Sequence, residues 1–197
     1  MRYDAEHKQR TRARVLKEAA KAIRGEGPHQ IGVADVMAKA GLTHGGFYAH
    51  FGSKDDLVVA AIAQMFDEAM AAFEHFTAGK APVAALATYI DFYLSPRHRD
   101  AQATGCPLPA LAADLPRLDR AARAGFTAGA ERLTSALSDL MSGLGHRDAT
   151  ELASSALAEM VGAISLARAI SDPRRSNQVL RHSRDALKRR LGIGDKS

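Results

Sequence analysis

The sequence predicts an all-α fold, and three observations lead to this prediction. Apolar residues recur at three- and four-residue spacing along most of the 197-residue chain, as they do on one face of a helix. No segment shows the sustained apolar–polar alternation that a half-buried strand requires. Glycine and proline stand mainly between the periodic segments, where helices are expected to begin and end.

The periodic segments give a series of helices behind the N-terminal region. The helix at 149–170 is apolar nearly all round, so we expect it to be buried in its own domain or against a partner. Cations crowd the last segment, which forms either a second nucleic-acid patch or the solvated side of a helix. The expected helices span 55–77, 83–94, 108–115, 117–141, 149–170 and 174–191, with a loop or broken helix at 97–109.

Residues 34–57, ADVMAKAGLTHGGFYAHFGSKDDL, are the most informative segment of the chain. Val36 and Met37 lie on the apolar stripe of a short helix, and Gly41 follows it where a left-handed cap residue is expected. A second short helix should then begin, with Phe47 and Phe51 on one face. This layout of helix, turn and helix behind a basic amphipathic helix is typical of a helix-turn-helix DNA-binding protein.

Two capping residues set the limits of the second short helix. Thr43 is a suitable N-cap, since its hydroxyl can accept a hydrogen bond from an unpaired backbone N–H. Ser53 and Asp56 form a capping box at the start of the next, long helix. The two glycines between these caps cost about 1 kcal/mol each in a helix, which is consistent with a backbone that must approach a DNA groove closely.

The charge is distributed unevenly along the chain. Residues 1–56 carry 10 Lys/Arg and 7 Asp/Glu, residues 57–173 carry 9 and 13, and residues 174–197 carry 8 and 2. A basic first segment and an acidic middle predict a DNA-facing layer on a body that avoids DNA. In the first helix, Arg10, Arg14, Lys17 and Lys21 form a cationic stripe that either contacts phosphate or is a solvated face. The same helix also contains the cations Lys8, Arg12 and Arg24, which are not part of this stripe.

The composition argues against several other classes of protein. A single cysteine excludes an internal disulfide framework and suits a reducing cytoplasm. No Cys/His cluster predicts a metal site, and no apolar run approaches the length of a membrane span. No nucleotide-binding loop or Gly-x-Ser-x-Gly motif is present, so we expect neither an enzyme nor a cofactor.

The same segment closely resembles the DNA-reading part of the TetR/AcrR family of bacterial one-component regulators. The resemblance covers about a quarter of the chain, from Arg10 to Leu57, and is carried by residues 41–51, Ser53-Lys54 and Leu57. Gly46 stands where many members have Thr or Ser, and Gly32 stands where many have a capping hydroxyl. The first departure removes an expected hydroxyl contact with DNA.

The resemblance implies a fold and a function. It implies a three-helix DNA-binding domain, which we place at residues 1–52, and a helical sensing and dimerising domain at 53–197. It implies a homodimer that pairs through its last two helices, binds a palindromic double-stranded operator and is released by a small-molecule or electrophile inducer. We therefore expect a cytoplasmic, nucleoid-associated repressor. A transcriptional activator of the same fold and a non-specific DNA-binding protein are the alternatives.

The expected DNA-binding residues follow from this layout. His44 and Tyr48 are expected to reach base edges or adjacent phosphates, and Lys54 to bind phosphate. The full expected set is Arg10, Arg14, Thr43, His44, Gly45, Tyr48, His50 and Lys54.

A ligand cavity is expected between the helices of the second domain, although Met and Phe at helical spacing are also ordinary core residues. An inducer there should tilt the long helix that begins near Lys54 and change the spacing of the two reading heads. The residues expected to line the cavity are Met65, Phe73, Tyr89, Phe92, Tyr93, Cys106, Phe126 and Met160.

Cys106 carries a separate hypothesis. The nearby cations Arg97 and Arg99 and a helix start at Pro107 are expected to lower the pKa of its thiol. The surrounding segment resembles that of a subgroup that includes electrophile- and oxidant-sensing repressors. The alternative is an inert, buried cysteine.

Overall fold

The computed structural model describes residues 2–193, and within that range all regular structure is helical. The prediction of an all-α fold is therefore confirmed. The last four residues of the predicted second domain lie outside the described part. In chain order the elements are α1 (Arg2–Glu26), α2 (Val33–Lys39), the 3-10 helix η1 (His44–Ala49), α3 (Lys54–Thr77), α4 (Pro82–Tyr93), α5 (Pro96–Asp100), η2 (Gln102–Thr104), α6 (Pro107–Leu111), η3 (Leu115–Arg117), α7 (Arg120–Ser142), α8 (Ala149–Ala169) and α9 (Pro173–Arg190).

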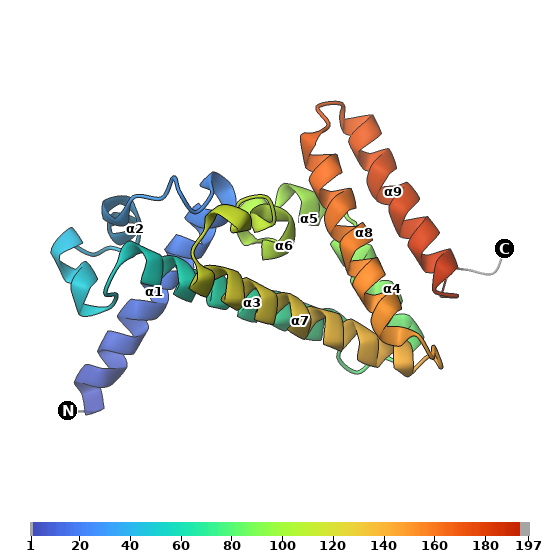
Figure 1. Cartoon of the computed structure of the whole chain (residues 1–197), viewed down its shortest axis with the longest axis horizontal. Coiled ribbons are helices and arrows are strands. Elements are labelled where there is room, and N and C mark those ends of the chain that lie inside the picture. The colour runs from blue at the N-terminus through green and yellow to red at the C-terminus, as the bar shows by residue number, and fades with distance from the viewer. Residues whose placement is uncertain (1, 194–197) are drawn as a thin grey trace.

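The molecule is elongated, with α1, α2 and η1 at one end and α8 and α9 at the other (Figure 1). The two long helices α3 and α7 run side by side along the long axis and connect these ends. The start of α3 lies beside the α1–α2–η1 end, so this helix joins the two parts of the molecule directly.

The α3–α7 crossing is unusually close. Gly129 of α7 faces the ring of Phe66, and a Cβ built on this glycine would lie 2.1 Å from Cγ of that ring. Phe126, one turn earlier, packs edge-on against Phe66 with ring centroids 5.5 Å apart. Only glycine leaves room for the backbone of α7 to approach Phe66 in this way.

Several predicted boundaries need correction. The second short helix is a 3-10 helix, and the expected helix at 117–141 begins only at Arg120. The Asp119 carboxylate accepts a hydrogen bond from the Ala122 N–H at 2.7 Å, and this cap separates α7 from η3. The loop expected at 97–109 contains the short helices α5 and η2, and α6 ends at Leu111 instead of continuing to residue 115.

The solvated-face interpretation fits the basic C-terminal helix. Arg184 and Lys188 lie 3.7 Å and 2.6 Å from the Asp91 carboxylate of α4, and Arg190 pairs with Glu159 of α8 at 2.9 Å. These cations tie the solvated side of α9 to the neighbouring helices.

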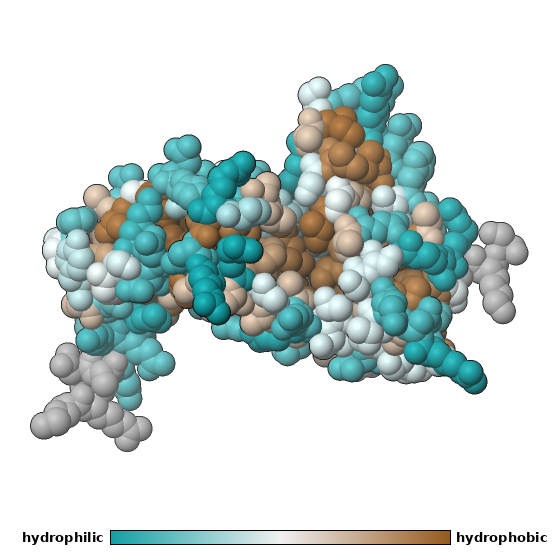
Figure 2. Space-filling model, in the orientation of Figure 1, coloured by the Kyte–Doolittle hydropathy of each residue, from teal (hydrophilic) through white to brown (hydrophobic). Residues whose placement is uncertain are grey.

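Helix α8 is long and apolar enough, by length and composition alone, to cross a membrane, although no uninterrupted apolar run was expected to reach that length. A core helix passes the same test. Only 39% of its apolar stretch is buried within this one chain, and Leu166 is 60% exposed. Figure 2 shows apolar surface over the part of α8 nearest to the α8–α9 turn. An apolar face exposed in this way is typical of a surface that contacts another protein or a membrane.

Candidate nucleic-acid interface and internal cavity

The turn between α2 and η1 has the predicted geometry. Gly41 adopts a φ of +71°, in the left-handed region that favours glycine, and the next N–H, of Leu42, donates to the Met37 carbonyl at 2.9 Å. Phe47 and Phe51 stack with ring centroids 5.6 Å apart, and both are buried. These contacts hold η1 against α2 and fix which side of η1 faces outward.

The expected hydroxyl cap of η1 is absent. Thr43 occupies the N-cap position, but its side chain makes no capping hydrogen bond. The Thr43 carbonyl instead accepts the Gly46 N–H at 3.1 Å, a three-residue spacing that makes the element a 3-10 helix. The Thr43 side chain is therefore exposed and free of this local role.

The outer face of η1 presents most of the residues predicted to contact DNA. Thr43, His44 and Gly45 are exposed, and Tyr48 is 71% exposed, a large fraction for an aromatic ring. A Cβ on Gly45 would meet nothing within 4 Å, so this backbone is open to a close neighbour. A convex helical face with an outward tyrosine and a bare backbone has the shape that enters a major groove.

His50 lies apart from this outer face. Its side chain is half-buried against Phe51, and its Nδ1 is buried without a hydrogen-bond partner among the described residues. Burial lowers the pKa of His50, and the neighbouring Lys8 and Arg12 lower it further. The neutral ring is thus surrounded by cations at the edge of the candidate interface.

The cations of α1 fall into two groups. Arg10 and Arg14 are exposed, and the Arg12 guanidinium lies 4.9 Å from the centre of the Phe51 ring. Arg24 is instead 2% exposed, so it does not belong to the predicted cationic face. Sequence spacing missed this because the carboxylate that pairs with Arg24, that of Glu68, is 44 residues away.

Lys54 stands at the first turn of α3, beside the α1–α2 loop. Its Nζ donates to the His29 carbonyl at 3.1 Å in a solvent-exposed hydrogen bond. The Ser53 hydroxyl accepts the Asp56 N–H at 3.0 Å, as the predicted capping box requires. The ammonium therefore lies at a helix N-terminus, where the helix dipole also favours anions.

A cavity of about 40 Å³ lies between α3, α4 and the segment that leads to α6. Four of the eight predicted ligand residues line it: Tyr89, Phe92, Tyr93 and Cys106. The other four do not line it: Met65, Phe73 and Met160 are buried core residues, and Phe126 packs on Phe66. The lining residues that the sequence did not indicate are Glu68, Ala69, Ala72, His98, Thr104 and Gly105.

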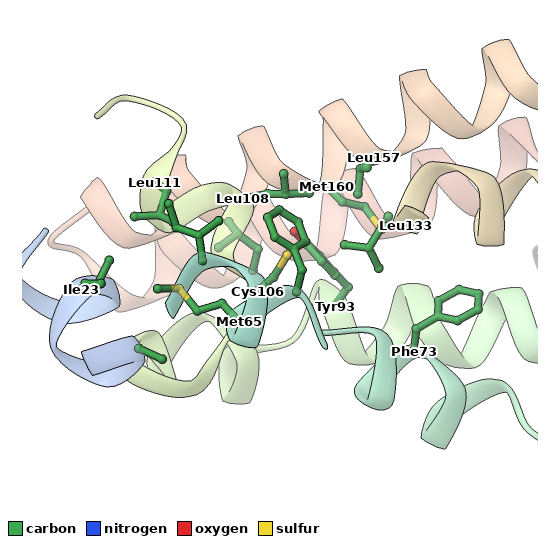
Figure 3. Close-up of a cluster of buried hydrophobic side chains, with 14 of the residues drawn as sticks. Ile23, Met65, Phe73, Tyr93, Cys106, Leu108, Leu111, Leu133, Leu157 and Met160 are labelled. Carbon is green, nitrogen blue, oxygen red and sulfur yellow. The ribbon is translucent and has the colours of Figure 1, made fainter. Parts of the chain in front are cut away.

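Cys106 lies in the centre of the buried cluster, beside Tyr93 and Leu108 (Figure 3). It is 7% exposed, and burial raises the pKa of its thiol above 9.0. The neighbouring Tyr93 side chain, the Leu108 backbone and the charges of Arg24 and Arg168 act in the opposite direction but more weakly. The expected lowering of the pKa is therefore wrong, because desolvation outweighs the cations.

His98 links the cavity wall to Cys106. Its Nε2 accepts the backbone N–H of Cys106 at 3.0 Å, so Nδ1 carries the ring proton and donates to the Tyr93 carbonyl at 2.8 Å. The ring is 3% exposed, and burial lowers the pKa of His98 below 6.5. Protonation at Nε2 would break the bond that holds the Cys106 backbone.

Stability is expected to fall when the pH drops below about 6.5 because of His98. The folded state resists protonation in that range, while the unfolded chain takes up a proton on this residue, so the equilibrium shifts toward unfolding. Above 6.5 the ring is neutral in both states, and the full stability is present. Thermal unfolding measured between about pH 7.5 and about pH 5.5 checks this expectation.

The control for this measurement is His98→Gln, which keeps a neutral donor and acceptor but cannot titrate. Its unfolding should depend less on pH than that of the unmodified protein, with a residual dependence from His50, whose pKa is also lowered. Equal pH dependence in the two proteins would contradict the role of His98.

Comparisons with known proteins agree with this arrangement. The sequence profile of "Bacterial regulatory proteins, tetR family" matches residues 15–61, which span the C-terminal half of α1, the whole of α2 and η1, and the start of α3. No sequence among the curated proteins matches the chain.

Solved structures match over nearly the whole chain. A TetR transcriptional regulator from Chloroflexus aurantiacus is 26% identical, with a TM-score of 0.81 over 96% of this chain and 98% of that one. Escherichia coli NemR in its reduced form is 19% identical, with a TM-score of 0.80 over 91% and 95%. A TetR-family regulator from Cytophaga hutchinsonii is 21% identical, with a TM-score of 0.80 over 97% and 98%. With the helix-turn-helix geometry and the all-helical body, these matches show that residues 15–61 carry the DNA-binding segment of the TetR family and that the chain has the fold of TetR-family transcriptional regulators, which are not enzymes.

Proposed function

We propose that this regulator is a cytoplasmic, nucleoid-associated repressor that binds a palindromic operator as a homodimer. The observation that carries the proposal is the outward face of η1. Tyr48 and the backbone of Gly45 are open to solvent there, and the stacked rings of Phe47 and Phe51 lie behind them. The exposed Arg10 and Arg14 and the partly exposed Lys54 supply contacts to phosphate. Residues 1–52 form the reading head.

The homodimer is proposed to form through α8 and α9 of the domain that spans 53–197. The exposed apolar face of α8 supports this, since a single chain leaves Leu166 in water. One short helix reads few base pairs, and two half-sites about 34 Å apart, or a multiple of that distance, raise specificity. The interface would be isologous, with the same surface used by both copies.

Release is proposed to occur when a small molecule or an electrophile enters the cavity beside Cys106. At about 40 Å³ the cavity is far smaller than a drug-sized ligand, so an inducer must widen it. The inducer must also bind the widened state more tightly than the DNA-bound one. Because Cys106 is 7% exposed, an electrophile reaches the thiol only when the segment around it opens.

The test is a binding assay on the DNA just upstream of the protein's own coding sequence, at fixed salt, with and without N-ethylmaleimide. Sequence-dependent binding supports the repressor, and loss of binding on alkylation assigns the response to the cysteine. The Cys106→Ser variant should then keep its DNA in the presence of the reagent. Binding that ignores the reagent leaves non-covalent occupation of the cavity as the route of release, and a lack of sequence-dependent binding would refute an operator at this position.

Lys54→Gln is expected to weaken binding to all DNA sequences alike. Each phosphate contact removed should reduce the slope of log K against log salt by about 0.9 per protomer. Binding titrations at several salt concentrations, on the operator and on unrelated DNA, measure both effects. His44→Ala is the matched contrast, since loss of a base contact should change the preference among operator variants instead. A Lys54→Gln defect confined to one base position would contradict the phosphate role.

A further inference from the structure

Arg24 is a charged side chain buried where α1 meets α3 and η2. Its Nη2 donates to the Glu68 carboxylate at 2.7 Å and to the Met65 carbonyl at 3.4 Å. Its Nη1 donates to the Ala103 carbonyl at 3.5 Å, and its own carbonyl accepts from Gln102 Nε2 at 3.4 Å. A single residue of the reading head is thus bonded both to the long helix and to the segment that precedes Cys106.

Stability alone does not account for an arginine at this position. The side chain is 1% exposed, and a buried ion pair is often no more stable than apolar residues of the same volume. Its Nε has no hydrogen-bond partner among the described residues, so the site is not fully satisfied. The guanidinium fork does hold several acceptors in fixed directions, which a flexible or apolar side chain cannot do. Within the packing of α1 against α3 and η2, Arg24 therefore fixes the directions of the polar contacts.

No other buried side-chain hydrogen bond joins residues 1–52 to the rest of the described chain. The bond from Lys54 to the His29 carbonyl also crosses this boundary, but it is exposed to solvent. Exposed polar contacts contribute little to holding two parts of a protein together. Among the described polar contacts, those of Arg24 are the ones able to fix the angle of the reading head.

The two anchors of Arg24 are also parts of the cavity wall. Glu68 lines the cavity, and its side chain is 34% exposed. Ala103 is followed directly by Thr104, Gly105 and Cys106, which line the opposite wall. Figure 3 shows Ile23, the neighbour of Arg24 in α1, in the same buried cluster as Cys106. An occupant that widens the cavity must therefore displace the groups that Arg24 holds.

We propose that Arg24 is the positioning residue through which occupation of the cavity changes the orientation of the reading head. The inference rests on the proposed function in taking the cavity as the effector site. When Glu68 moves away, the guanidinium is left buried without its carboxylate partner, which is strongly unfavourable. When the Ala103 carbonyl moves away, Nη1 loses its hydrogen bond. The C-terminal half of α1 must then shift until the charge regains a partner or water. The reading head moves with α1.

The experiment is a double-mutant cycle in the free protein, read by hydrogen exchange of the backbone amides at 15–26. Ala72 lines the cavity, and Ala72→Leu fills it without a ligand. In the otherwise unmodified protein this change should speed exchange in α1 about tenfold, within the usual range of coupling between sites. In an Arg24→Met background it should have no further effect. The same acceleration in both backgrounds, or none in the unmodified background, would overturn the proposal.

Asp67→Asn is the matched control. Asp67 precedes Glu68 on α3 and pairs with Arg132 at 2.9 Å, but this pair is exposed and does not touch α1. The effect of Ala72→Leu should therefore persist in this background. If it disappears there as well, the coupling does not depend on Arg24.

Arg24→Lys is a second variant, needed in case Arg24→Met fails to fold. It keeps the positive charge but lacks the planar guanidinium, so we expect a folded protein in which Ala72→Leu has a smaller effect on exchange in α1. An undiminished effect would contradict the role of the guanidinium. The cycle needs no DNA, so a lack of binding to the upstream DNA would refute an operator at that position and leave the role of Arg24 to be decided by hydrogen exchange.

Discussion

Gly129→Ala is expected to lower the free energy of unfolding by about 2 kcal/mol, even though alanine is the better helix former. The new Cβ would lie 2.1 Å from Phe66 Cγ, so the ring or the whole of α7 must shift. The ring is confined by Phe126 and the core around it, and overpacking of this kind outweighs the gain of about 1 kcal/mol in helix propensity. Urea denaturation measures the change.

Gly125→Ala is the control for this prediction. It lies one turn earlier on the same helix, where the nearest atom to a new Cβ is Ile62 Cγ2 at 4.0 Å. This variant should be more stable than the unmodified protein, by up to about 1 kcal/mol. Phe66→Leu combined with Gly129→Ala should recover part of the loss, because the smaller side chain leaves room for the methyl group. Equal stability of the two alanine variants would mean that the α3–α7 crossing tolerates extra volume.

Leu166→Glu is expected to convert the proposed homodimer into monomers and to lower operator affinity by at least about a hundredfold. In an isologous interface the substitution appears twice, and each carboxylate would be buried against apolar surface without a partner. The two reading heads then bind independently and lose the advantage of being linked. Sedimentation analysis gives the oligomeric state, and a binding titration gives the affinity.

Val83→Glu is the matched control for the dimer prediction. Val83 is another large apolar side chain with substantial exposure, 50%, but it lies at the start of α4. This variant should remain dimeric and bind DNA normally. A dimer that survives Leu166→Glu would place the interface on another surface.

Local sequence patterns predicted most of the fold because local rules govern helix boundaries. Gly41 and Ser53 have the backbone and capping roles that their neighbours implied. Thr43 does not, because its side chain makes no capping hydrogen bond, and only its carbonyl, which accepts the Gly46 N–H, takes part in the start of η1. The position of a cap was predictable here, whereas the type of helix was not.

The cavity was harder to predict because its walls depend on long-range packing. His98 reaches Cys106 through a hydrogen bond between a ring nitrogen and the backbone, and no spacing rule indicates such a contact. Arg99 was expected to lower the pKa of Cys106, but it is bonded to Asp100 and Ser176 instead. Whether a cation lies near a thiol in space, and how deeply the thiol is buried, are properties of the tertiary structure. Of the residues that the sequence suggested, Tyr89, Phe92, Tyr93 and Cys106 line the cavity, whereas Glu68, His98 and Thr104 were not suggested.

The close contact between Gly129 and Phe66 holds α3 against α7 at one point along its length, and a rotation of α3 would pivot about that point. From Phe66 to Lys54 the helix spans 12 residues, or about 18 Å at about 1.5 Å per residue. Each 10° of rotation about this point would carry the end of α3 through about 3 Å, and two symmetry-related copies of the helix would change the gap between their ends by up to about 6 Å. In the proposed homodimer, with half-sites about 34 Å apart, such a change would shift one head along its groove. A fixed contact at Phe66 would therefore amplify a small expansion near the cavity into a larger displacement at the reading heads.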